Sequence, residues 1–403
     1  MFNCSFLQYP AHSRNACFSR SYLLRVDREG ASAKIMNILQ VAKFSYLESY
    51  GGIEQVIKNI VLYTTPLGCR HTLLVLSDQV KEITTQEFAE VTIVRFPMSL
   101  NVASCPMSLA LLMHIKPYFA KADIVHYHFP WPFGELLHIL FCVKKPSLVT
   151  YHSDIIKQKI LKQIYDPLMQ KFLASMDKIV ATSENYLQSS PILQRYLDKT
   201  VVIPIGIDID TYPKPSNEIL QAWRKKLPEK FILFVGVLRY YKGVHILLEA
   251  VRGTAIPLII VGAEAEEIKL KQQATGMPNV QFLGALNDED KVALFTLAQA
   301  VILPSHLRSE ALGISLVEGA MFAKPMISTE IGTGTSFVNE NNVTGFVVPA
   351  NNPDALKHAM LELLNDDELA KKMGTAAKQR YEKYFTATDM GKAYYQLYQE
   401  LFS

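Results

Sequence analysis

Two glutamates, Glu310 and Glu318, bracket the segment SEALGISLVE (residues 309–318), which follows an apolar run that predicts a strand over residues 300–304. Carboxylates only accept hydrogen bonds, so this pair suits the hydroxyl groups of a sugar or a ribose. Gly313, between them, would let a ligand approach the backbone, and a helix beginning there would point free N–H groups at an anion. The groups concerned would be those of Ile314, Ser315 and Leu316. Taken alone, the ten residues are equally typical of a solvated surface.

Two cations follow an earlier predicted strand, in the segment FVGVLRYYKGVHILLEA (residues 234–250). Arg239 and Lys242 fall in the loop of this segment, and a glycine precedes the helix. An arginine can bind a diphosphate through two parallel hydrogen bonds, whereas a lysine acts as a point charge. The segment therefore predicts a diphosphate site, with a solvated basic loop as the alternative.

A pair of glycines, Gly51 and Gly52, separates the first predicted strand from the first predicted helix. Paired glycines allow a phosphate or a sugar to approach the backbone, and the helix start adds its dipole. The segment lacks the G-x-G-x-x-G pattern of a dinucleotide fingerprint and the acidic residue expected about 20 residues later. This argues against a dehydrogenase.

Histidines end two further predicted strands, in DIVHYHFPWPFGE and LVTYHSDIIKQK. His126 alternates inward and is predicted to be structural, whereas His128 and His152 are predicted to face a ligand. Asp154 either binds a second substrate or caps the helix that follows. The same two alternatives hold for Lys157.

The elements that must position these residues are short apolar strands alternating with helices. Strands are predicted in the first half over residues 35–42, 72–77, 91–96, 123–127, 148–151, 178–182 and 201–204. Near residues 206–214 the pattern pauses, and it then restarts with a second set. Such alternation is typical of parallel sheets covered by helices on both faces. Because ligands bind outside the carboxyl ends of parallel strands, two such sheets predict a cleft between them.

The sequence therefore predicts an α/β protein of two doubly wound, Rossmann-like domains facing across a cleft. The domains are expected over residues 34–208 and 209–385. Residues 1–33 show neither alternation nor a helical period, and we expect a disordered extension there. Residues 386–403 predict a helix that crosses back to the first domain.

The motifs together resemble the family 4 glycosyltransferases, retaining enzymes of the GT-B fold. The resemblance rests on the cations of VLRYYKG and on the E-x7-E pair Glu310 and Glu318. Further matching segments are YGGIEQVIKNI, TYHSD, IPIGID and VTGFVVPANNPDAL. It covers nearly everything from Lys34 onward. One departure is that the family often places its arginine directly after the glycine ending the strand, where this chain has Val237, so Lys242 is a safer assignment than Arg239.

The resemblance implies a role for each matching residue. Glu310 would contact the donor sugar, and Glu318 the ribose hydroxyls. Arg239 and Lys242 would neutralise the leaving diphosphate, which the backbone of residues 313–316 would also hold. His152 would lie near the reacting sugar in an acceptor-side first domain, with the nucleotide-sugar in the second.

The implied reaction moves a hexose from a nucleotide-diphospho-sugar to a hydroxyl of a glycan or lipid-linked acceptor. The segments most resemble bacterial mannosyltransferases of cell-surface polysaccharide and lipopolysaccharide assembly, so GDP-mannose is the first donor expected and UDP-hexoses the second. A nucleotide-sugar 2-epimerase of similar fold and a non-catalytic sugar-binding subunit remain as alternatives.

The composition of the 403-residue chain excludes some classes of partner and cofactor. A net charge of +3, without basic runs, argues against nucleic acid. Five scattered cysteines without a CxxC pair favour a reducing, cytoplasmic compartment. Asp208 and Asp210 mimic a metal-binding DxD pair, but lysine, arginine and a helix start already supply positive charge. We therefore expect neither a metal nor another cofactor.

The segment following His152, residues 154–178, is basic and amphipathic. Such a helix usually covers a sheet at the surface, but it can also lie on an anionic membrane. Peripheral contact with the inner face of the cytoplasmic membrane is therefore the second expectation for this segment.

Overall fold

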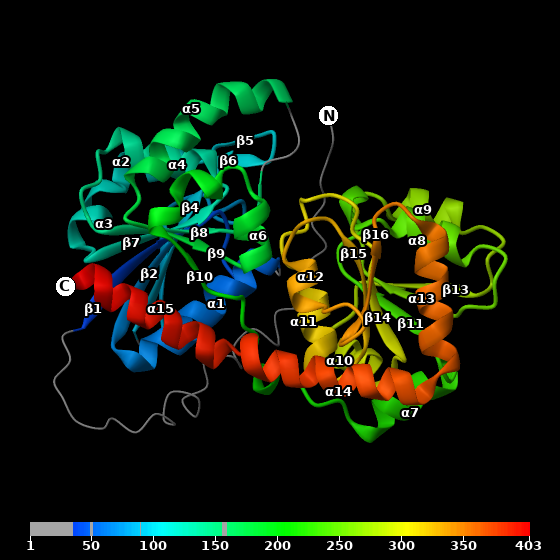
Figure 1. Ribbon diagram of the computed structural model, residues 1–403. Coiled ribbons are helices and arrows are strands. Elements are labelled where there is room, and N and C mark those ends of the chain that lie inside the picture. The colour runs from blue at the N-terminus through cyan, green and yellow to red at the C-terminus, as the bar shows by residue number, and fades with distance from the viewer. Residues whose placement is uncertain (1–34, 49–50, 89, 155–158) are drawn as a thin grey trace.

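The computed structural model describes residues 35–403 apart from residues 49–50, 89 and 155–158, and for residues 159–164 it describes the backbone alone. The expected extension over residues 1–33 and the candidate Lys157 lie outside the described residues. The described chain forms two lobes, each built on its own sheet (Figure 1).

The first lobe is built on a sheet that has eight strands among the described residues. In spatial order these are β10 (Thr200–Val202), β9 (Lys178–Ala181), β8 (Ser147–Tyr151), β7 (Ile124–Phe129), β1 (Met36–Val41), β2 (Cys69–Ser77), β4 (Val91–Pro97) and β3 (Thr84–Phe88). The strands pair in parallel except for the edge strand β3, which is antiparallel to β4. Buried apolar side chains of β7 and β8 form the centre of its core.

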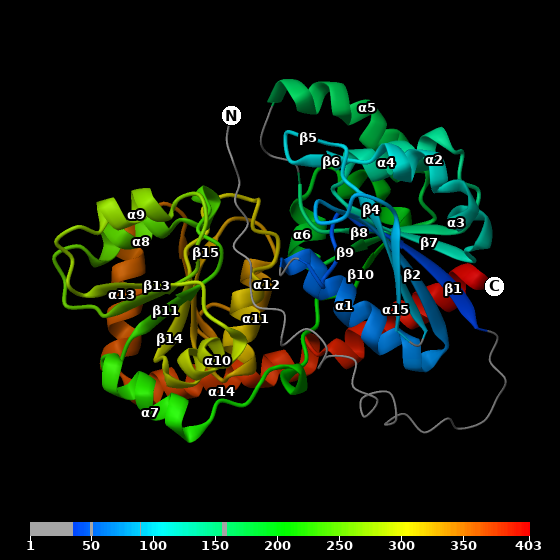
Figure 2. The ribbon, with the colours of Figure 1, turned by 180° about the vertical axis from the view of Figure 1, so that it is seen from behind.

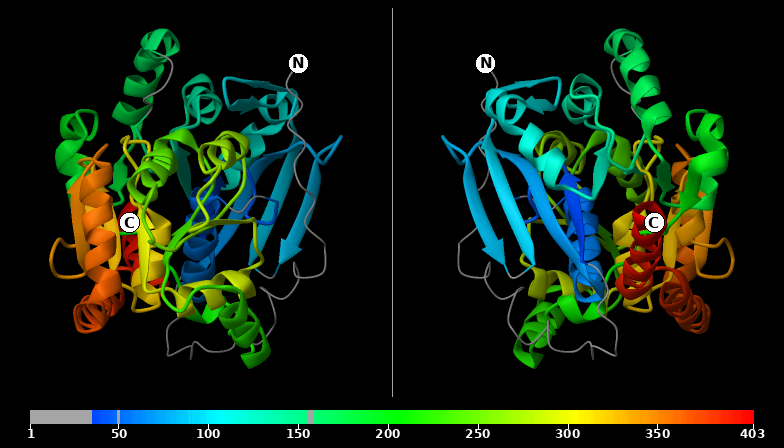
Figure 3. Two further views of the ribbon diagram at one scale, coloured as in Figure 1. Left: turned by 90° about the vertical axis from the view of Figure 1, so that its right-hand side faces the viewer. Right: turned by 90° about the vertical axis from the view of Figure 1, so that its left-hand side faces the viewer.

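Helices and a short hairpin surround this sheet. They are α1 (Gly52–Thr64), α2 (Leu109–His114), α3 (Lys116–Lys121), α4 (Pro132–Leu140), α5 (Lys159–Ser175) and α6 (Glu184–Ser189), with the hairpin β5 (Leu100–Val102) and β6 (Cys105–Met107). The short 3₁₀ helices are η3 (Thr65–Leu67) and η4 (Leu193–Lys199). The helix α5 lies at the top of the lobe in Figures 1 to 3.

The second lobe has six parallel strands among its described residues. Their order is β13 (Val280–Gly284), β12 (Leu258–Val261), β11 (Ile232–Val235), β14 (Ala300–Leu303), β15 (Met326–Glu330) and β16 (Gly345–Pro349). The flanking elements are η5 (Ile209–Thr211), α7 (Asn217–Lys226), η6 (Tyr240–Lys242), α8 (Val244–Val251), α9 (Glu267–Gln273), α10 (Asp288–Leu297), α11 (Ile314–Met321), α12 (Thr335–Val338) and α13 (Pro353–Asn365). All the side chains of β11, β12 and β14 are buried, as expected for central parallel strands.

The chain crosses between the lobes twice. The helix α14 (Asp367–Tyr384) packs on the second lobe, and α15 (Ala387–Phe402) packs against α1 and β7 of the first, as Figures 1 and 2 show. The two crossings lie side by side, because Ile207 N–H donates to Phe385 O (2.9 Å) and Ala387 N–H donates to Ile207 O (3.0 Å). A Cβ at Gly206 would overlap the carbonyl of Thr386, so glycine allows this close approach.

Candidate active site

The loop after β11 brings Lys242 to Glu310. Lys242 Nζ lies 2.6 Å from Glu310 Oε2, and Ser305 Oγ donates to the same oxygen over 3.2 Å. Each side chain of the ion pair is 10% exposed. Burial disfavours the charged form of Lys242, but the adjacent Glu310 carboxylate outweighs this and raises the pKa of the lysine. The pair is therefore a fixed, nearly water-free ion pair at the carboxyl ends of β11 and β14.

Arg239 lies apart from this pair. Its side chain is 55% exposed, and its Nε lies 3.1 Å from Glu264. Burial works against the charge of Arg239, but Glu264 first and Glu54 of α1 as well keep its pKa raised. The structure thus places Lys242, and not Arg239, beside Glu310.

The helix α11 starts next to the ion pair. Its first turn follows Gly313, whose φ of +83° is the left-handed conformation that glycine adopts most readily. Ser315 Oγ is buried there without a hydrogen-bond partner in the protein. The prediction that the Leu316 N–H is free is wrong, because this group donates to Gly313 O over 2.9 Å. The Leu316 N–H bonds to the carbonyl three residues earlier instead of four, so only the first two N–H groups of this helix start are left for a ligand.

The starts of α1 and α11 meet between the lobes. A Cβ built on Gly52 would lie 3.0 Å from Ile314 Cδ1. At Gly51, a Cβ would overlap the Glu54 carboxylate. The paired glycines of the first lobe and the helix start of the second therefore face the same small region, with two helix dipoles directed toward it.

Glu318 lies within the first two turns of α11 and is held by two side chains that the sequence does not single out. Tyr212 OH donates to its Oε1 over 3.0 Å, and Lys291 Nζ lies 3.2 Å from the same oxygen. Burial opposes the charge of Lys291, but Glu318 and then Asp288 outweigh this and raise the pKa of the lysine. Glu318 is thus the second buried carboxylate of this lobe that is paired with a lysine.

On the first lobe, His152 and His128 lie in a buried hydrogen-bonded chain. His128 Nδ1 lies 3.1 Å from His152 Nε2, and His128 Nε2 lies 2.9 Å from Gln40 Oε1. Gln40 Nε2 in turn donates to Tyr398 OH of α15 over 3.1 Å. Burial lowers the pKa of His152 to about 3 and holds that of His128 well below its usual range. Both imidazoles are therefore neutral at neutral pH.

His126 is fully buried beneath this chain. Its two ring nitrogens lie 2.8 Å from Tyr398 OH and 2.8 Å from Thr150 Oγ1. Both nitrogens are thereby satisfied inside the protein. His126 accordingly joins α15 to the sheet, which agrees with the structural role that its alternation indicates.

Asp154 is held by side chains of both lobes. Its carboxylate accepts from Tyr151 OH (2.8 Å), from Ser190 Oγ (3.0 Å) and from Arg308 of the second lobe (3.3 Å). Arg308 lies in the loop that also carries Glu310, and sequence reasoning missed it. Lys157, predicted to act beside Asp154, lies outside the described residues.

The two aspartates of the DxD pattern are engaged elsewhere. Asp208 accepts from the backbone N–H of Asp210 over 2.9 Å and from Tyr63 OH. Within the described part of the chain, no group of three or more His, Cys, Asp or Glu side chains is arranged to hold a metal ion. None of the described helices is long and apolar enough to cross a membrane.

Comparison of the sequence with known proteins identifies the family of the chain. The sequence matches the family models described as "Glycosyltransferase Family 4" over residues 50–211 and "Glycosyl transferases group 1" over residues 215–380. The D-rhamnosyltransferase WbpZ of Pseudomonas aeruginosa is 48% identical over 355 residues, which cover 87% of this chain and 93% of the relative. The O-antigen chain mannosyltransferase C of Escherichia coli is 44% identical over 368 residues, which cover 91% and 99%.

Solved structures share the fold at much lower identity. The sucrose-phosphate synthase of Thermosynechococcus elongatus superposes with a TM-score of 0.75 at 18% identity, over 91% of this chain and 99% of that one. Anabaena HepE in complex with UDP gives 0.72, also at 18% identity, over 91% and 100%. The predicted GT-B architecture is thereby confirmed. With the two family models and the relatives more than 40% identical, this shows that the chain belongs to glycosyltransferase family 4 and is a glycosyltransferase.

Proposed function

We propose that the chain transfers a hexose, with mannose as the first candidate, from a nucleotide-diphospho-sugar to a hydroxyl of a glycan or lipid-linked acceptor, with retention at the anomeric carbon. The observation that carries this proposal is the buried Lys242–Glu310 pair beside the start of α11, where Ser315 Oγ lacks a partner. A site of this kind offers a cation, N–H dipoles and a free hydroxyl to a diphosphate, and a carboxylate to a sugar.

In the proposed step, the bond between the anomeric carbon and the diphosphate oxygen breaks. The acceptor oxygen forms its bond on the same face, and the acceptor proton passes to the departing phosphate oxygen. Lys242 and the start of α11 stabilise the negative charge that develops on the diphosphate. His152 is neutral, so it supports the reacting sugar as a hydrogen-bonding group without transferring charge.

The activities named for the two relatives support the choice of sugar and of biological setting in this proposal. One relative is an O-antigen chain mannosyltransferase and another a D-rhamnosyltransferase. We therefore place the reaction in the synthesis of bacterial cell-surface polysaccharide, with D-rhamnose as the second candidate sugar. Glu318 would bind the ribose of the donor, since it lies one turn beyond the diphosphate site on the same helix.

The test is a purified transfer assay with matched donors. The protein is incubated with GDP-mannose, GDP-linked D-rhamnose or UDP-glucose and a mannose-containing oligosaccharide acceptor. The expected product carries one added hexose in the α configuration of the donor, read by mass spectrometry and nuclear magnetic resonance. A β-linked product would overturn retention, and failure with all three donors, while WbpZ transfers in parallel, would overturn the proposed donors.

A peripheral membrane position is a separate part of the proposal. Large apolar side chains one helical turn apart are exposed on two helices of the first lobe: Leu109 and Met113 on α2, and Leu136 and Leu140 on α4. We expect the protein to sediment with vesicles of anionic lipid and to lose this binding in a Leu109→Ser/Met113→Ser variant. Equal sedimentation of that variant would refute a role for α2.

A further inference from the structure

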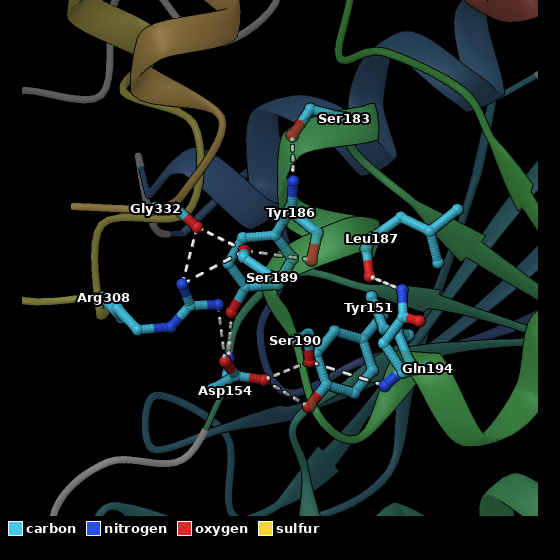
Figure 4. A network of polar contacts seen from close by, with 11 residues as sticks. Tyr151, Asp154, Ser183, Tyr186, Leu187, Ser189, Ser190, Gln194, Arg308 and Gly332 are labelled. Carbon is cyan, nitrogen blue, oxygen red and sulfur yellow. Dashed lines mark hydrogen bonds and ion pairs between the residues drawn. The ribbon is translucent and has the colours of Figure 1, made fainter. Parts of the chain in front are cut away.

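The guanidinium of Arg308 bridges the two lobes (Figure 4). Within its own lobe, Nη1 donates to Gly332 O in the loop between β15 and α12, over 2.6 Å. Toward the first lobe, Nη1 donates to Ser189 Oγ at the end of α6 (3.1 Å), and Nη2 to Asp154 (3.3 Å). The side chains of Arg308 and Asp154 are 28% and 12% exposed.

The receiving side of this contact is held by buried side chains of the first lobe. Tyr151 and Tyr186, which flank Asp154, are both fully buried. Tyr186 OH lies 2.6 Å from the Asp154 backbone nitrogen, and the Arg308 guanidinium lies 5.4 Å from the Tyr186 ring centroid. Because these groups are fixed by the core of the first lobe, Asp154 gives Arg308 a defined position.

The bridge lies between two parts of the proposed site. Arg308 precedes Glu310 by two residues in one loop, and Asp154 follows His152 by two residues after β8. The pair joins a loop of one lobe to a loop of the other. Its main physical effect is therefore to fix one loop relative to the other.

We propose that Arg308 is a positioning residue, which holds the loop of Glu310 against the first lobe so that the donor sugar meets the acceptor with water excluded. Closure of this kind excludes water, which limits donor hydrolysis, and brings the reacting atoms together. The proposal rests on the proposed sugar transfer for its kinetic consequence, but the bridge itself can be tested without turnover.

The chain offers a matched control in Arg380. This arginine also donates to a backbone carbonyl, Phe337 O, over 2.7 Å, pairs with Glu340 over 2.7 Å and lies over two aromatic rings. These contacts of Arg380 lie within the second lobe. Arg380→Gln therefore removes similar interactions without touching the contact between the lobes.

The experiment compares Arg308→Gln, Arg308→Lys, Asp154→Asn and Arg380→Gln in the full-length protein. We expect Arg308→Gln to lower kcat for transfer by about 10- to 100-fold, the usual cost of a small misplacement, and to raise the ratio of donor hydrolysis to transfer. Arg308→Lys should fall between, because lysine keeps the charge but lacks the planar fork. The double variant with Asp154→Asn should lose no more transfer than the more impaired single variant.

Hydrogen exchange provides the readout that does not need turnover. In Arg308→Gln, exchange should rise in both residues 184–189 and 305–312, whereas Arg380→Gln should leave both unchanged. An Arg308→Gln variant with wild-type transfer, hydrolysis ratio and exchange overturns the inference, as does a loss of transfer explained by a matching loss of folded protein. If exchange rises as expected but the wild-type protein transfers no sugar, the proposed function fails and the bridge stands.

Discussion

The two sides of the proposed site differ in how they carry charge. The second lobe presents two buried carboxylate–lysine pairs, Glu310 with Lys242 and Glu318 with Lys291. The first lobe presents neutral imidazoles, with His152 bonded to His128. Charge develops on the departing diphosphate and not on the acceptor hydroxyl, so buried cations are most useful on the side of the diphosphate. The difference supports the proposal that the donor binds the second lobe.

Breaking the charged side should have the largest effect. Lys242→Met leaves Glu310 as a buried carboxylate without its cation, which typically costs 3–5 kcal/mol of stability as well as activity. Lys242→Met/Glu310→Gln removes both charges and should recover stability. Both variants should lower kcat by about 10³-fold, the upper range for one lost electrostatic stabiliser. Turnover by the double variant near the wild-type rate, with its melting temperature preserved, would show that the pair is not needed for the reaction.

Replacing the neutral His152 of the first lobe should reduce activity less than replacing Lys242. His152→Asn should lower kcat for transfer by about 10²-fold, the lower range for a lost hydrogen-bonding group at a reacting centre. His126→Asn is the matched control, because His126 is also buried and both of its ring nitrogens are bonded inside the protein, one to Tyr398 OH and one to Thr150 Oγ1. We expect this control to lower the melting temperature and to keep kcat per folded molecule. If the two variants lose turnover equally, the proposed contact of His152 with the reacting sugar is wrong.

Acid should destabilise the neutral side selectively. The folded pKa of His152, about 3, lies below the unfolded value of about 6.5. The unfolded chain therefore binds more protons below pH 6.5, so the stabilising contribution is fully present above pH 6.5 and is lost as the pH falls toward 3. Between pH 6.5 and 5 this group alone should cost about 2 kcal/mol. Urea titrations across this range measure this loss of stability, and the slope of stability with pH should be smaller in His152→Asn than in the wild-type protein.

The smallest effect is expected at the second carboxylate. Glu318→Gln keeps the shape of the side chain and its hydrogen bond from Tyr212, but it removes the charge that Lys291 faces. We expect KM for the donor to rise about 10-fold, equivalent to about 1.4 kcal/mol, with kcat nearly unchanged. Such a pattern is the mark of a contact made equally in the ground and transition states. A fall in kcat without a change in KM would place Glu318 in the chemical step instead.

Much of this site could be predicted because its elements are locally encoded. Central strands such as β11 and β14 are continuous apolar runs, and Gly313 marks the start of α11. The edge strand β3 was missed because its sequence, TTQEF, is polar and its side chains are only partly buried. The family and the transferase activity are confirmed by the relatives, which removes the 2-epimerase and the silent subunit as alternatives.

The missed site residues share one physical cause. Tyr212 bonds to Glu318 across 106 residues of sequence, and Arg308 bonds to Asp154 across 154. Neither distance leaves a periodic pattern, since the partners meet only once both sheets have formed. Lys291 lies in a polar helix start, where a lysine is typical of solvent exposure. Roles read from single motifs are therefore incomplete wherever a carboxylate needs a partner from another element.

The paired crossings near Gly206 and Thr386 have a consequence for how the lobes can move. Ile207 is bonded to residues 385 and 387 through its own N–H and carbonyl groups, so neither segment can slide past the other without breaking these bonds. A movement of one lobe relative to the other that keeps these bonds therefore leaves the same residues joined. The crossings thereby limit the arrangements in which Arg308 can meet Asp154.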